Sequence, residues 1–122
     1  MIDQTPPKRV LIVDDEQDLI DPLALRLRAS GHCEVAVANN GAEGLRQAER
    51  FQPDLVLVDL SMPEMDGWEL CRRLRADPRT SGAQIVIMTA WVSRDLEKRV
   101  IAEGANRLLL KPFDESELMA LL

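Results

Sequence analysis

Residues 54–67, DLVLVDLSMPEMDG, decide the fold of this chain. The apolar run at residues 55–58 has the composition of a buried strand, and it delivers a carboxylate, Asp59, to the end of that strand. Pro63 then breaks the chain into a loop that closes at Asp66 and Gly67. We expect a carboxylate in this position to be exposed and rigidly held.

Other apolar runs in the chain also stop at polar, reactive side chains. These are Asp14 and Asp15 after residues 10–13, Thr89 after residues 85–88, and Lys111 after residues 108–110. If the strands are parallel, all these ends meet at the edge where open α/β sheets place their sites. That edge would gather three carboxylates, one hydroxyl and one ammonium group.

Strand-like and helical segments alternate five times along the chain. The expected strands cover residues 10–14, 34–38, 55–59, 84–89 and 107–110. The expected helices cover residues 17–29, the segment from Gly41 to the stop at residues 52–53, residues 67–76, a segment from about Ser93 to the stop at Gly104, and residues 114–122. Short connections and right-handed crossovers predict a doubly wound (βα)5 α/β fold with three layers. The alternating pattern of residues 34–38 favours an edge strand.

Composition limits the classes of function. The chain has 122 residues, 46% hydrophobic and 30% charged, as expected of one globular domain. A net charge of -6 argues against a nucleic-acid-binding surface on this domain. Its apolar runs are much shorter than the roughly 20 residues of a membrane span, and residues 1–3 lack the basic start of a signal peptide, so we expect a cytoplasmic protein. We expect residues 1–7 to be a disordered lead before a domain at residues 8–122, whose last helix is short enough to be truncated.

The predicted cluster suits phosphoryl chemistry. Asp14, Asp15 and Asp59 would repel one another unless a positive group lies among them, and oxygen-only ligands of this kind suit Mg²⁺. Lys111 supplies a second positive charge, which would neutralise the oxygens of a transferring phosphoryl group. Asp59 is the best nucleophile, because it ends the central strand before a loop. The Thr89 hydroxyl and the following N–H, of Ala90, could bind phosphoryl oxygens.

These motifs resemble the receiver domain of bacterial two-component response regulators. The resemblance rests on Asp14-Asp15, on Asp59 with Met62-Pro63 and Met65-Asp66-Gly67, on Thr89-Ala90, and on Lys111-Pro112-Phe113, and it covers essentially the whole chain. It implies a flavodoxin-like sheet with the strand order 2-1-3-4-5. It also implies a signalling switch that catalyses its own phosphorylation and dephosphorylation, and not an enzyme that turns over a free substrate.

The resemblance also implies a role for each matching residue. Asp59 would accept phosphate from the phosphohistidine of a sensor histidine kinase or phosphotransfer protein. Mg²⁺ would be bound directly by Asp15, Asp59 and the carbonyl of Ser61, with Asp14 acting mainly through water. Lys111 would pair with the phosphoryl group, Thr89 would move toward it, and the Lys111-Pro112 bond would be cis. The switched surface would serve an output domain or a downstream protein, or would form a homodimer on activation.

Two positions qualify the resemblance. Receivers usually carry an aromatic switch residue three positions before the lysine, whereas this chain has Leu108, which would transmit the change by packing or leave the output face to be read differently. Trp91, two residues after Thr89, is expected to shield the acyl phosphate and lengthen its lifetime.

Two other functions stay open: an interaction module that never takes phosphate, and a haloacid dehalogenase-like phosphatase. The phosphatase family places a second Asp two residues after its nucleophile, where this chain has Ser61.

Overall fold

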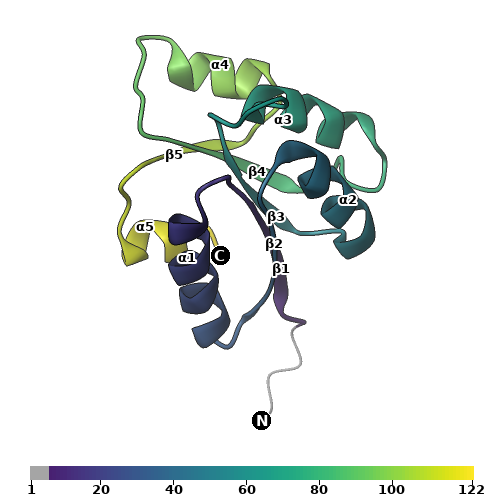
Figure 1. The fold of residues 1–122 in the computed structure, drawn as a ribbon, viewed down its shortest axis with the longest axis vertical. Coiled ribbons are helices and arrows are strands. Elements are labelled where there is room, and N and C mark those ends of the chain that lie inside the picture. Colours follow the sequence, from purple (N-terminus) through teal and green to yellow (C-terminus); the bar gives the residue numbers. More distant parts are fainter. Residues whose placement is uncertain (1–5) are drawn as a thin grey trace.

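The computed structural model describes residues 6–122, so residues 1–5 of the predicted lead lie outside the described residues (Figure 1). Strands and helices alternate along the described chain as predicted. The strands are β1 (Lys8–Val13), β2 (Cys33–Ala38), β3 (Leu55–Asp59), β4 (Gln84–Thr89) and β5 (Arg107–Leu110). The helices are α1 (Gln17–Ala29), α2 (Gly41–Phe51), α3 (Gly67–Ala76), α4 (Leu96–Ala102) and α5 (Glu115–Met119).

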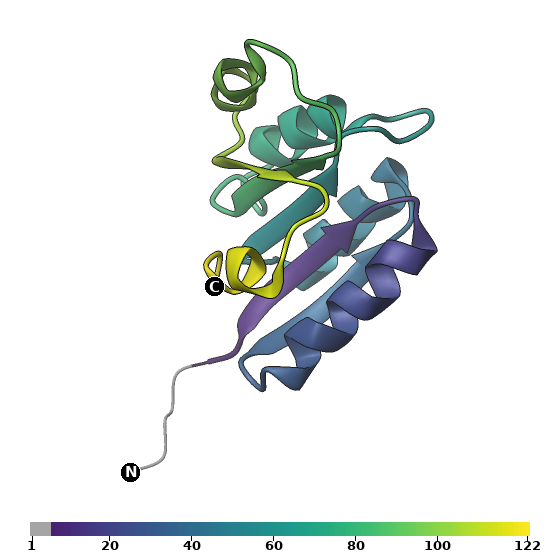
Figure 2. The same cartoon turned by 90° about the vertical axis from the view of Figure 1, so that its left-hand side faces the viewer.

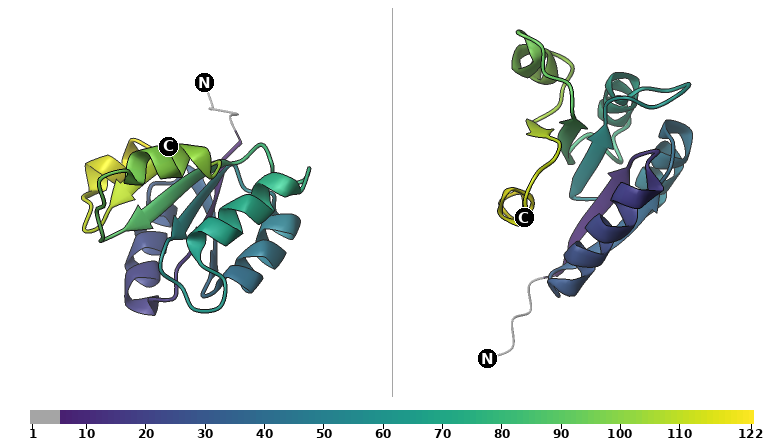
Figure 3. Two further views of the ribbon diagram at one scale, coloured as in Figure 1. Left: turned by 90° about the horizontal axis from the view of Figure 1, so that it is seen from above. Right: turned by 60° about the vertical axis from the view of Figure 1, so that its left-hand side comes forward.

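The strands form one parallel sheet in the order β2-β1-β3-β4-β5, which confirms the predicted order and the edge position of β2. Helices α1 and α5 cover one face, while α2, α3 and α4 cover the other (Figures 2 and 3). The central strand β3 is buried along its whole length, as its unbroken apolar run predicts. The three-layer architecture therefore brings the carboxyl ends of the strands together at one edge of the sheet, between the two helical layers.

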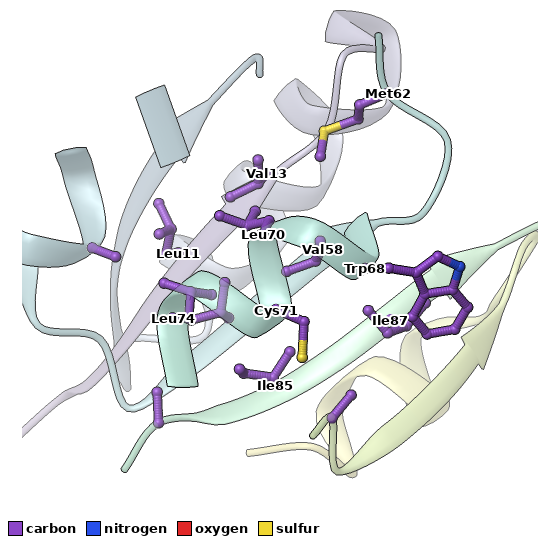
Figure 4. Packing of buried hydrophobic residues seen from close by; sticks show 14 of the residues in the cluster. Leu11, Val13, Val58, Met62, Trp68, Leu70, Cys71, Leu74, Ile85 and Ile87 are labelled. Carbon is purple, nitrogen blue, oxygen red and sulfur yellow. The ribbon is translucent and has the colours of Figure 1, made fainter. Parts of the chain in front are cut away.

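Alternate residues of each inner strand serve two separate cores. Val56 and Val58 of β3 face α2, α3 and α4, where Leu70 and Leu74 of α3 pack against them (Figure 4). Leu55 and Leu57 of the same strand face α1 and α5. This period of two fixes the register of the central strands, because a slip of one residue would exchange the two faces.

Helices α1, α2 and α3 have the boundaries that the sequence predicts, whereas α4 begins late and α5 ends at Met119, before the predicted end at Leu122. Helix α1 begins at Gln17 as predicted, with Pro22 in its sixth position. Asp114 caps α5, because its side chain accepts a hydrogen bond from the N–H of Glu117. Helix α4, however, begins at Leu96 and not near Ser93, and its N-cap residue Asp95 makes no side-chain capping bond. Residues 90–95 instead form an exposed connection from β4.

Candidate functional site

The four predicted strand ends meet at one edge of the sheet. Parallel pairing places Val13 beside Val58, Asp59 beside Met88, and Thr89 beside Leu110. The next residues along β1 and β5 are Asp14 and Lys111, so the acidic and basic side chains arrive at the same level. Asp14, Asp59 and Thr89 are buried there, and Lys111 is half-buried.

Lys111 lies between the carboxylates. Its Nζ donates to Asp14 Oδ2 at 2.9 Å and to Asp59 Oδ1 at 3.2 Å, and it lies 3.7 Å from Glu16 Oε1. The Lys111 side chain is only 13% exposed, so its pairs with Asp14 and Asp59 are shielded ion pairs, whereas the Glu16 side chain is 66% exposed. One ammonium group thus offsets part of the negative charge of a cluster that would otherwise repel itself.

Asp59 is 4% exposed, so the prediction of an exposed carboxylate is wrong. Lys111 and Asp14 occupy two sides of it, and the chain that follows β3 stays close to the sheet, because Leu60 N–H donates to Met88 O at 3.0 Å. Gly67 then returns against the same strand end, where a Cβ atom would lie 2.7 Å from the Asp59 carbonyl oxygen. A glycine is required at this close approach, which anchors the start of α3 at Asp59.

Burial changes the acidity of the central carboxyl group. Desolvation, together with the negative charge of Asp14, raises the pKa of Asp59 to about 6, although Lys111 opposes the shift. Burial alone would lower the pKa of Lys111, but its hydrogen bond to Asp14 and the charge of Asp59 outweigh this effect and hold that pKa above its ordinary value. The Lys111 ammonium group therefore stays charged at pH 7, and the Asp59 carboxyl group titrates near pH 6.

The donor atoms at this edge fit a hard divalent cation. Carboxylate oxygens of Asp14, Asp15, Glu16 and Asp59 can all lie within 4.8 Å of one another. Such an oxygen-only set is what Mg²⁺ prefers, and a cation there would offset the burial and the Asp14 charge that raise the pKa of Asp59. Sequence reasoning did not include Glu16, although its place directly after the acidic pair was a usable signal. Ser61 lies exposed two residues after Asp59, and the role of its carbonyl stays a prediction.

Thr89, at the end of β4, and the two residues that follow it lie at the same sheet edge as the carboxylates. The Thr89 side chain is buried, and its Oγ1 accepts a hydrogen bond from the N–H of Trp91 at 3.1 Å. Ala90 is exposed beside it, and the Trp91 side chain is 78% exposed. Leu108, on the neighbouring strand β5, is partly buried against the core formed with α3 and α4. The Lys111-Pro112 peptide bond is cis, as the resemblance implies.

Comparison with known proteins assigns the class. Residues 10–122 match the response regulator receiver domain family, so the chain belongs to that family. The DNA-binding response regulator MtrA of Mycobacterium tuberculosis is 39% identical over 116 residues, which are 95% of this chain and 49% of MtrA. The DNA-binding dual master transcriptional regulator RpaA of Synechocystis is 36% identical over 112 residues, which are 92% of this chain and 46% of RpaA. The chain therefore spans about half the length of these relatives.

A solved structure supports the same assignment. The chemotaxis protein CheY4 of Vibrio cholerae superposes with a TM-score of 0.88 at 29% identity, covering 94% of this chain and 95% of that one. The chain is thus the receiver domain of a two-component response regulator, a signalling switch. Over residues 6–122, no helix has the length and apolar content to cross a membrane.

Proposed function

We propose that this domain accepts phosphate on Asp59 from the phosphohistidine of a histidine kinase or phosphotransfer protein, in a reaction that requires Mg²⁺. The observation that carries this proposal is the position of Lys111 Nζ between Asp14 and Asp59, inside an acidic cluster at the sheet edge. This arrangement combines a nucleophilic oxygen with fixed positive charge, which is the requirement of phosphoryl transfer. A cytoplasmic location belongs to the same proposal.

In the transfer, an Asp59 carboxylate oxygen attacks phosphorus and the P–N bond of the donor breaks. The bonding electron pair goes to the donor imidazole, which takes up a proton as it leaves. Mg²⁺, held by Asp15, Asp59 and the Ser61 carbonyl, with Asp14 acting through water, would neutralise charge on the phosphoryl oxygens. Lys111 turns from Asp59 toward the transferred group, and the Ala90 N–H donates to it.

Thr89 links the new group to the surface. Its hydroxyl can donate to a phosphoryl oxygen if the side chain moves toward Asp59, and the bond that it accepts from Trp91 N–H must then adjust. The same movement would open space beside Leu108, which packs against the core between the sheet and helices α3 and α4. Phosphorylation would therefore shift the populations of two arrangements of the segment after β4.

Intact mass measurement tests this function. The domain is incubated with Mg²⁺ and acetyl phosphate, beside Asp59→Asn and the matched control Asp54→Asn at the opposite end of β3. We expect one added phosphoryl group on the wild type and on the control, lost with a chelator and absent from Asp59→Asn. An unmodified wild type that still binds Mg²⁺ would contradict the proposal.

That outcome would favour a receiver-like interaction module that works without phosphate. The observation on its side is Leu108, which lacks the ring that receivers usually move between exposed and buried positions. Binding of such a module to its partner would be the same for the wild type and for Asp59→Asn. Phosphate dependence of that binding would exclude it.

A further inference from the structure

Strand β5 is short and ends directly before Lys111, a central residue of the site. It has four residues, lies at the sheet edge and pairs only with β4, from Val86–Arg107 to Thr89–Leu110. Lys111 follows it directly. Since side chains alternate between the faces of a strand, a slip of one residue would replace Lys111 with Leu110 or Pro112 at the carboxylates.

Asn106 fixes the start of this strand. Its N–H donates to Ile85 O at 2.8 Å, and its side-chain Oδ1 accepts from Ile85 N–H at 2.7 Å. Asn106 therefore satisfies both backbone groups of one β4 residue before the regular β4–β5 ladder begins. At the other end, Lys111 N–H donates to Thr89 O at 2.8 Å. Each end of β5 is thus fixed to β4 by hydrogen bonds.

Arg75, at the end of α3, holds Asn106 in this position. Its Nη2 donates to Asn106 Oδ1 at 2.7 Å, and its Nε donates to Gly104 O at 2.7 Å. Its Nη1 donates to Ser81 O at 2.8 Å and to Ala83 O. The planar guanidinium thus joins the residues before β4 to the residues before β5, a task that the single ammonium group of a lysine cannot perform.

Gly104 allows this approach. Its φ of +95° lies in the region that favours glycine, and a Cβ there would stand 3.2 Å from Arg75 Cγ. The chain can therefore turn from α4 into β5 directly over the arginine side chain. The opposite end of α3 begins at Gly67, against the Asp59 carbonyl. One helix thus connects the end of the strand that carries Asp59 with the start of the strand that ends directly before Lys111.

We infer that Arg75 and Asn106 form a register clamp that positions Lys111 against Asp59. Both are positioning residues, because they act through β5 and contact neither the carboxylates nor the phosphoryl group. The functional part of this inference rests on the proposed function, since it concerns the rate of phosphoryl transfer. The structural part, the register of β5, stands without it.

Amide hydrogen exchange tests the clamp directly, without phosphate. Asn106→Leu removes the shared acceptor at similar volume, whereas Asn106→Asp keeps an oxygen for both Ile85 N–H and Arg75. We expect exchange at Ile85 to accelerate by tenfold or more in Asn106→Leu and to stay near the wild-type rate in Asn106→Asp. Arg75→Lys should accelerate it as well, while Arg73→Lys, on the exposed face of α3, should not. Unchanged protection of Ile85 in Asn106→Leu would overturn the clamp.

Phosphorylation by acetyl phosphate tests the consequence for Lys111. We expect the rate to fall by about tenfold to a hundredfold in Asn106→Leu, as a small misplacement of a catalytic group does, and to recover in Asn106→Asp. In a Lys111→Met background, Asn106→Leu should cause almost no further loss, because the residue it positions is gone. An equal loss in both backgrounds would overturn the positioning role and assign Asn106 to general stability.

The clamp can also be tested if the proposed function fails, so the two failures can be told apart. If the wild type takes no phosphate, NMR signals of the Lys111 ammonium group replace the rate as the second measurement. They should shift in Asn106→Leu and return in Asn106→Asp if the clamp sets the position of Lys111. Unshifted signals in Asn106→Leu would overturn the inference, whatever the phosphorylation result.

Discussion

The ends of β1 and β3 and the segment that leaves β4 lie at the same edge of the sheet, but they are held in different ways. Asp14 and Asp59 are buried and joined through Lys111. All six residues of the segment 90–95 are exposed, and the hydrogen bond from Trp91 N–H to Thr89 Oγ1 is the side-chain contact that ties its start to the site. Asp14, Asp59 and Lys111 are therefore held in place before any reaction, whereas residues 90–95 have few contacts that would oppose a rearrangement.

We expect the largest effect when the buried ion pairs of Lys111 are removed. Lys111→Met leaves Asp14 and Asp59 without their ammonium partner, and losing one partner of a buried ion pair typically costs about 3 to 5 kcal/mol. Urea unfolding at pH 7 in a chelator should show this loss. Saturating Mg²⁺ should restore part of it, because the cation replaces the missing charge. An unchanged stability in chelator would mean that the carboxylates are solvated and not held by Lys111.

Mg²⁺ should stabilise the buried carboxylate cluster. A ligand at a hundred times its Kd adds about 2.7 kcal/mol of stability, so chelation at pH 7 should lower the free energy of unfolding by about that amount. The gain should shrink at pH 5, because Asp59, with a pKa of about 6, then holds a proton that the cation must displace. Urea unfolding with Mg²⁺ or chelator at both pH values measures it. An equal gain at both would exclude Asp59 as a ligand.

Asp59→Asn tests the cost of the buried charge itself. Without Mg²⁺, the rise in the pKa of Asp59 from 3.8 to about 6 corresponds to about 3 kcal/mol, a value that already includes the opposing effect of Lys111. We therefore expect Asp59→Asn to be up to about 3 kcal/mol more stable than the wild type at pH 7. Because the folded-state pKa is raised, the wild-type carboxyl group costs nothing below about pH 4, where both states are protonated. The difference should thus grow from pH 4 to 6, and a pH-independent difference would contradict its electrostatic origin.

The sequence predicted the strand ends that carry the carboxylates and Lys111 better than it predicted the exposed segment 90–95. The run at residues 55–58, the polar residue at each strand end and the stops of α1 and α3 are local patterns, and local patterns suffice to specify parallel strands that meet at one edge. The burial of Asp59 could not be predicted, because it depends on Lys111 folding across from another strand. The bonds from Arg75 to Asn106 join residues 31 positions apart and leave no periodic signal. The late start of α4 reflects a turn before the helix, in which Leu96 N–H donates to Ser93 O at 3.3 Å and the Asp95 side chain makes no capping bond.

The smallest effect on stability, and the most informative about the exposed side, should come from Trp91→Ala. The indole is 78% exposed, so the free energy of unfolding should change by less than about 0.5 kcal/mol. The backbone of Trp91, however, is bonded to the hydroxyl that would move toward the phosphoryl group. If the ring then swings over the acyl phosphate and excludes water, its removal should shorten the lifetime of phosphorylated Asp59, measured as loss of the added mass after the phosphodonor is removed.

Val92→Ala is the matched control, because Val92 is the next residue, is 71% exposed and has no bond to Thr89. A shorter lifetime in Trp91→Ala alone would mean that the exposed segment is recruited by the reaction at the buried side. Equal shortening in both variants would instead indicate that any loss of apolar surface from residues 90–95 changes their arrangement. An unchanged lifetime in both would show that the buried carboxylates and Lys111 set the lifetime by themselves. The Trp91 ring would then have no role in shielding the acyl phosphate.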